Sequence, residues 1–147
     1  MESYKRTKKV TYENAQYDSM DEVHYVKHLQ KLKASGEILN YERAEKCILI
    51  PKFVDNSGKT ILPITYTPDF LIYHLDGSLE YIEIKGYMME DAALKVKLFK
   101  YSLLGTGIRF TILTRNLKHG DESGFIEYDK LKKIRSANRR AKSGGAD

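Results

Sequence analysis

Two carboxylates and a lysine lie close together in the middle of this sequence, on short apolar segments. Asp69 follows Pro68 and opens an apolar run, and Glu83 and Lys85 come fourteen and sixteen residues after Asp69. Residues two apart on a strand point to the same face, so we expect Glu83 and Lys85 to share one face of a sheet. Carboxylates are ligands that hard divalent cations such as Mg²⁺ prefer, and a lysine can hold or deprotonate a water molecule. These are the groups needed for metal-assisted hydrolysis of a phosphodiester.

The segments that carry these side chains are predicted to be neighbouring strands. Apolar runs at 69–75 and 79–85 are separated by turn residues that include Asp76-Gly77,. If the two runs pair, both carboxylates and the ammonium group come within reach of one another on one face.

Hydrophobic periodicity and turn residues predict the other elements. A helix is expected to begin after the N-cap Ser19 and to end at Ser35-Gly36, and a second helix to begin at Glu90 or Asp91,. Further strands are predicted at 37–54 (one or two strands), 61–66 and 108–114, with a hairpin turn at 55–59,. Residues 1–16 are expected to be extended, and residues 128–140 fit a short helix.

The pattern Pro68-Asp69 followed by Glu83-Ile84-Lys85 resembles the motif of the PD-(D/E)xK nuclease superfamily. With the segment 17–22 upstream and a lysine-bearing helix downstream, the chain resembles a small phage- and prophage-associated, junction-resolvase-like endonuclease family over roughly residues 5 to 115. The resemblance implies an α/β (α+β) fold with a restriction-endonuclease-like core. In that core a central mixed β-sheet is flanked by helices, in the order α-β-β-β-α-β.

The resemblance also implies a role for each motif residue. Asp69 and Glu83 would bind Mg²⁺ or Mn²⁺ together with the backbone carbonyl of Ile84, and Lys85 would position the attacking water. Glu22, on the first helix, would complete the metal site and the catalytic set. Glu22 also stands three residues after the N-cap, where a capping box explains it equally well, so both interpretations stay open,.

Positive charge is concentrated towards the end of the chain. The net charge is +5, and residues 130–147 contain seven Lys/Arg and one Asp, which leaves −1 for the rest. The nuclease domain that the resemblance implies is therefore expected to be a single domain at 1–129, with an extended basic arm at 1–16, followed by a basic tail at 130–147 that binds a polyanion. The alternatives are that the tail only increases solubility and that Lys95 and Lys97 only form a solvated face of the second helix. The candidate DNA-binding residues are Lys95, Lys97, Lys132, Lys133, Arg135, Arg139 and Arg140.

Other classes of protein are less compatible with the sequence. No apolar run is long enough to span a membrane and the N-terminus lacks the apolar core of a secretory signal, so no membrane partner is expected,. The single cysteine, Cys47, is expected to be a buried core residue, with a reducing cytoplasm as the default location,. His24 and His28 are four apart on the first helix, but no third ligand stands at zinc spacing,.

These observations predict a metal-dependent endonuclease that hydrolyses DNA, which for a phage-encoded chain acts in the cytoplasm of the bacterial host. By resemblance, branched or four-way-junction DNA of phage recombination or replication is the most specific substrate, and a homodimer would supply two symmetric sites. Two alternatives remain: a non-catalytic DNA-binding module with a nuclease fold, and an RNA-processing nuclease of the same fold.

Overall fold

The computed structural model describes residues 9–144. In chain order the elements are β1 (Val10–Tyr12), β2 (Ala15–Tyr17), α1 (Met20–Ala34), β3 (Asn40–Arg43), β4 (Cys47–Ile50), β5 (Phe53–Val54), β6 (Thr60–Ile61), β7 (Ile64–Tyr66), β8 (Phe70–Tyr73), β9 (Leu79–Ile84), α2 (Glu90–Ser102), β10 (Arg109–Arg115), β11 (Phe125–Glu127) and α3 (Tyr128–Gly144).

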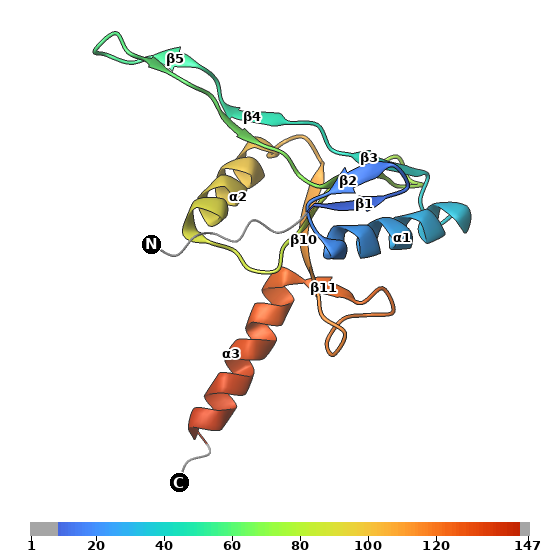
Figure 1. Cartoon of the computed structure of the whole chain (residues 1–147). Helices are drawn as coiled ribbons and strands as arrows, with labels where there is room; N and C mark the ends of the chain where they lie inside the picture. The colour runs from blue at the N-terminus through green and yellow to red at the C-terminus, as the bar shows by residue number, and fades with distance from the viewer. Residues whose placement is uncertain (1–8, 145–147) are drawn as a thin grey trace.

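A five-stranded mixed sheet is the centre of the fold (Figure 1). Its strand order is β11-β10-β9-β8-β3. Strands β9 and β10 run parallel, and the other neighbours run antiparallel. The crossover between the parallel strands contains α2, as a parallel connection requires. Along the chain, α1, β3, β8, β9, α2 and β10 follow one another in the predicted order α-β-β-β-α-β, and the predicted mixed α+β fold is confirmed.

Helix α1 covers one face of this sheet. Ser19 caps it as predicted, because its Oγ accepts a hydrogen bond from the Glu22 N–H at 3.2 Å,. The buried side chains of the first core come from α1, β8, β9 and their neighbours: Tyr17, Val23, Tyr25, Val26, Leu29, Ile38, Phe70, Ile72, Ile82, Ile84 and Phe125. The cap therefore fixes where α1 begins, and the core fixes which side of it faces the sheet.

Helix α2 covers the opposite face. A second core contains the buried side chains Tyr66, Val96 and Phe99, with Tyr81 and Phe110 packed against it. Tyr81 belongs to this core whereas its neighbour Ile82 belongs to the first, which is the alternation expected of a strand buried on both faces,. Glu83, two residues after Tyr81, is thereby directed to the α2 face.

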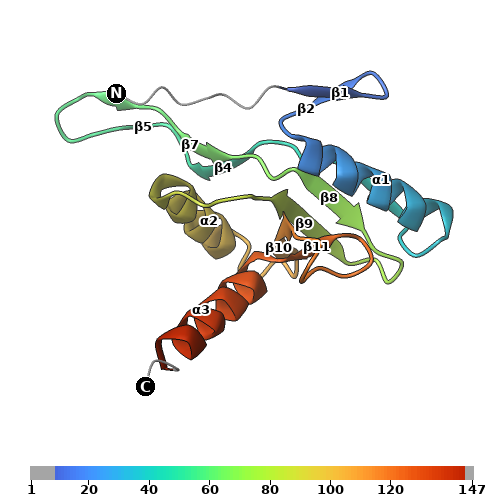
Figure 2. The same ribbon diagram turned by 60° about the horizontal axis from the view of Figure 1, so that its bottom comes forward.

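An arm formed by residues 47–66 is inserted between β3 and β8 and extends away from the sheet (Figures 1 and 2). It consists of two short ribbons, β4 paired with β7 and β5 paired with β6. The strand predicted at 61–66 is interrupted at Pro63, which has no N–H to donate to a neighbour,. Cys47 packs against the second core but is only partly buried, so the full burial expected for it is wrong.

At both ends of the described chain the structure differs in detail from what was expected, an extended segment at 1–16 and a basic tail at 130–147. Residues 10–17 fold back as the hairpin β1–β2 around Glu13 and Asn14, whose positive φ angles suit a tight two-residue turn; residues 1–8 lie outside the described part,. The helix expected at 128–140 is confirmed and continues to Gly144 as α3, which points away from the sheet in both views (Figures 1 and 2). None of the helices within residues 9–144 combines the length and apolar character that crossing a bilayer requires.

Candidate active site

The register of β8 and β9 brings Asp69 and Glu83 together. Asp69 stands in a bend immediately before β8, one residue beyond the last pair of the ladder, Phe70 with Ile82. Its N–H donates to the Ile82 carbonyl at 3.0 Å, which holds Asp69 at the end of β9 beside Glu83. The juxtaposition expected from the two apolar runs and their turn is present in the structure.

Asp69 is held by the backbone of the neighbouring strand. Its Oδ2 accepts a hydrogen bond from the Ile84 N–H at 2.7 Å. Burial, followed by the nearby Glu83 and Glu22 carboxylates, nevertheless raises the pKa of Asp69 to about 9. Without a cation, the ionised form is therefore unfavourable at neutral pH. The structure places the Ile84 N–H at the site, whereas the role expected for its carbonyl stays a prediction.

Glu83 is buried and paired with the motif lysine. Its Oε1 lies 3.4 Å from Lys85 Nζ, and the Glu83 side chain is 8% exposed against 29% for Lys85. Burial raises the pKa of Glu83, and the Lys85 ammonium opposes that shift. The Lys85 N–H donates to the Leu113 carbonyl at 2.9 Å, so the adjacent strand β10 fixes the lysine backbone.

Glu22 reaches the same cluster from the first turn of α1. It is buried, and its carboxylate is close enough to Asp69 to contribute to the raised pKa of that residue. Its Oε2 accepts a hydrogen bond from Ser19 Oγ at 3.4 Å, so it also serves the helix cap. The two interpretations of Glu22 are compatible, because Oε1 remains for a second role.

The residues present fit a divalent cation bound through part of its coordination shell. Within residues 9–144, Glu22 Oε1 and Glu83 Oε2 are buried without a hydrogen-bond partner, which is unfavourable unless another group satisfies them,. No three His, Cys, Asp or Glu side chains in this part of the chain are already spaced as a complete metal cage. Mg²⁺ does not need one, since one or two carboxylates with water and phosphate oxygens suffice.

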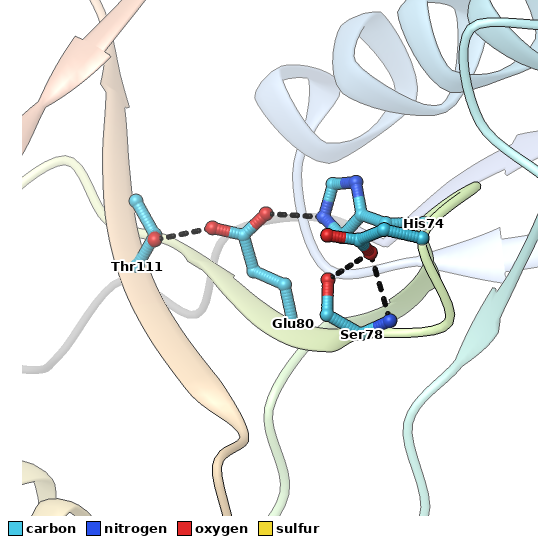
Figure 3. A network of polar contacts seen from close by, with 5 residues as sticks. His74, Ser78, Glu80 and Thr111 are labelled. Atoms are coloured by element: carbon cyan, nitrogen blue, oxygen red, sulfur yellow. Dashed lines mark hydrogen bonds and ion pairs between the residues drawn. The ribbon is translucent and has the colours of Figure 1, made fainter.

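Glu80, near the other end of β9, is a carboxylate that has a protein partner at each of its oxygens (Figure 3). Glu80 Oε1 lies 2.8 Å from His74 Nε2, and Glu80 Oε2 accepts a hydrogen bond from Thr111 Oγ1 at 2.6 Å. Both oxygens of Glu80 are therefore satisfied by the protein itself. Glu83, three residues later on the same strand, keeps one oxygen unused.

One residue at the site was not predicted from the sequence. Tyr66, the last residue of β7, has a buried hydroxyl near Glu83. Tyr66 stands three residues before Asp69, and a buried tyrosine hydroxyl usually needs a partner, which was the available signal.

The residues predicted to bind DNA lie outside the carboxylate cluster. Lys95 and Lys97 are exposed on α2, and neither forms an ion pair with a residue in 9–144. The others are exposed on α3: Lys132, Lys133, Arg135, Arg139 and Arg140. Leu131 anchors α3 to the body, because it is buried at the base of the helix. The basic side chains beyond it face solvent.

Comparison with known proteins assigns the chain to a family. The family model described as "Protein of unknown function (DUF1064)" matches residues 1–121. No curated protein matches the chain at a significant level. The matched region contains every residue of the carboxylate cluster and ends before α3. Since it covers most of the 147 residues, the chain belongs to the DUF1064 family.

Proposed function

We propose that this protein is a Mg²⁺- or Mn²⁺-dependent endonuclease of the PD-(D/E)xK type that hydrolyses phosphodiester bonds in DNA. One observation carries the proposal: buried Glu83 and partly buried Asp69 are neighbours next to Lys85, and the cluster retains carboxylate oxygens without partners among residues 9–144. Perturbed carboxylates that gather beside a single ammonium group are typical of catalytic sites. A cluster built only for stability would satisfy its oxygens, as Glu80 does.

The chain's own residues divide the work as follows. Asp69 and Glu83 would hold the cation, with Glu22 beside them. A bound divalent cation would supply electrostatic stabilisation of the charge that develops on the phosphate. Lys85 Nζ, anchored at Glu83, would orient a water for in-line attack on phosphorus. As the new O–P bond forms, the bond to the 3′-oxygen breaks, which leaves a 5′-phosphate.

The substrate proposed is DNA, with branched or four-way DNA as its most specific form. The exposed cations of α3, with Lys95 and Lys97, would contact backbone phosphates, which supply most of the affinity of such complexes,. A domain of this size encloses little of a duplex, so two copies would act as a homodimer with two symmetric sites. The location proposed with this substrate is the cytoplasm.

The proposal is tested by incubating the protein with linear, nicked, flapped and four-way DNA in Mg²⁺, in Mn²⁺ and in EDTA. We expect strand cleavage that depends on the cation and stops in EDTA. An RNA set of matched shape separates a deoxyribonuclease from an RNA-processing enzyme. Binding to DNA without cleavage of any substrate in either metal would instead establish a non-catalytic DNA-binding module.

Glu22→Gln separates the two roles of that residue. Gln can still serve the cap, so we expect the thermal midpoint to stay within about 2 °C, which corresponds to well under 1 kcal/mol in a domain of this size. Loss of the carboxylate charge should weaken metal-dependent cleavage by about tenfold. Ser19→Ala is the companion variant: it should lower stability by about 1 kcal/mol, and because it keeps the Glu22 charge and removes only one long hydrogen bond to it, cleavage should fall less than in Glu22→Gln,. Full activity in Glu22→Gln would leave only the cap.

Truncation after Arg135 tests the contribution of α3. It preserves the packing of Leu131 at the helix base and removes three basic residues, Arg139, Arg140 and Lys142. For every phosphate that the shortened helix no longer neutralises, the slope of log K against log salt should decrease by roughly 0.9 on duplex DNA. Cleavage at saturating DNA and low salt should persist, because the carboxylate cluster is untouched. If binding measured across a salt series gives the same slope for both proteins, α3 does not grip phosphate.

A further inference from the structure

Tyr66 occupies the point where the arm joins the active site. It is the last residue of β7, is 9% exposed, and pairs with Cys47 across the β4–β7 ribbon. Its ring lies 4.8 Å from the ring of Phe99 and 6.0 Å from that of Phe110, the second contact edge-on at 90°. Packing on two sides leaves the ring little freedom, so the direction of its hydroxyl is fixed by the core.

The hydroxyl of Tyr66 and one carboxylate oxygen of Glu83 are buried near one another without completing a hydrogen bond. Within residues 9–144 neither the Tyr66 hydroxyl nor Glu83 Oε2 has a partner of ordinary geometry, although both are buried. Both side chains lie on the α2 face of the sheet, and they are near enough for the Glu83 carboxylate, after burial itself, to raise the pKa of Tyr66. A donor and an acceptor that both lack partners at this proximity complement one another.

We propose that Tyr66 is a positioning residue whose hydroxyl donates to Glu83 Oε2 and holds that carboxylate in the orientation that binds the divalent cation. This inference rests on the proposed function of the site. Lys85 holds the other oxygen, Oε1, from the exposed side, so the two interactions together would fix the plane of the carboxylate. Carboxylates that bind metal are generally hydrogen-bonded in turn, and removal of such a supporting group typically weakens metal affinity 10–100-fold.

Tyr66→Phe tests this assignment, because it removes the hydroxyl and keeps the ring in its aromatic cluster. We expect Mn²⁺ affinity, measured by titration calorimetry on the intact chain, to fall by about tenfold or more. The thermal midpoint of the metal-free protein should fall by no more than about 4 °C, since one hydrogen bond contributes about 1 kcal/mol and the ring packing is kept. In cleavage assays, the Mn²⁺ concentration needed for half-maximal rate should rise by a similar factor.

Tyr81→Phe is the matched control. Tyr81 belongs to the same cluster, 5.3 Å from the ring of Phe99, but its hydroxyl faces Cys47 Sγ at 3.9 Å instead of a carboxylate. Its Mn²⁺ affinity should equal that of wild type. Wild-type affinity in Tyr66→Phe, or an equal reduction in both tyrosine variants, would overturn the positioning role alone. A wild-type chain that binds Mn²⁺ no more tightly than Asp69→Asn does would overturn the proposed function and this inference with it.

Discussion

Asp69→Asn and Glu83→Gln should each reduce metal-dependent DNA cleavage by about a hundredfold or more, the usual effect of removing a preorganised electrostatic interaction from an active site. Each change removes one negative charge and preserves the shape of the side chain. Folding should survive, because burial disfavours the charged form of both carboxylates and a neutral amide avoids that cost. The measurement is a single-turnover rate at saturating Mg²⁺ on the DNA form that the wild-type protein cleaves best.

Glu80→Gln is the control for these two variants. Glu80 lies on the same strand as Glu83, but its oxygens are already engaged by His74 and Thr111 (Figure 3). Gln can retain hydrogen bonds to both neighbours, so we expect cleavage at the wild-type rate. Wild-type rates in Asp69→Asn and Glu83→Gln would show that the cluster is not the catalytic site. If Glu80→Gln reduced the cleavage rate by the same factor, the loss would reflect a general effect on stability and would not support a catalytic role for the cluster.

The parts of the site that depend on local pattern could be predicted from the sequence. Alternation along 79–85 predicted Glu83 and Lys85 on one face, and the turn at Asp76-Gly77 predicted that the two runs pair and bring Asp69 near them; the pairing of β8 with β9 is confirmed. Those inferences need only the period of a strand and the pairing of two consecutive segments. The N-cap at Ser19 was equally local and is confirmed.

The parts that depend on distant contacts could not be predicted in the same way. Tyr66 meets Glu83 only because the arm returns beside β4 and packs its ring against α2. The strand β11 is three residues long and is defined by its pairing with β10, a contact that no periodicity in so short a segment reveals. The helix at 128–140 was predicted and is confirmed, but its continuation to Gly144 required the structure.

Stability of the metal-free protein should fall as pH rises from about 4 to 9, and this fall should be smaller in Asp69→Asn. The unfolded chain releases the Asp69 proton near its ordinary pKa of 3.8, whereas burial beside Glu83 and Glu22 raises the folded-state pKa to about 9. Between these values the folded state binds one proton more than the unfolded state, so rising pH favours unfolding.

Thermal melts in EDTA from pH 4 to pH 9 measure this effect. We expect Asp69→Asn to melt higher than wild type at pH 8 by about 3 °C or more, equivalent to about 1 kcal/mol, and the difference to vanish near pH 4. Asp76→Asn is the control, because the pKa of Asp76 is shifted in the opposite direction: hydrogen bonds from Ser78 lower it. The Asp76 charge therefore does not destabilise the fold at pH 8. This variant should not melt at a higher temperature than wild type.

Added Mn²⁺ should reverse the pH trend in the wild-type protein alone. A cation favours the ionised carboxylates, so the rise in melting temperature at saturating Mn²⁺ should be larger at pH 8 than at pH 5 and should disappear in Asp69→Asn. A gap between the two metal-free proteins that does not change with pH would show that Asp69 is already ionised in the fold. An equal Mn²⁺ effect in both would place the cation elsewhere, because a site that needs the Asp69 carboxylate cannot stabilise a chain that lacks it.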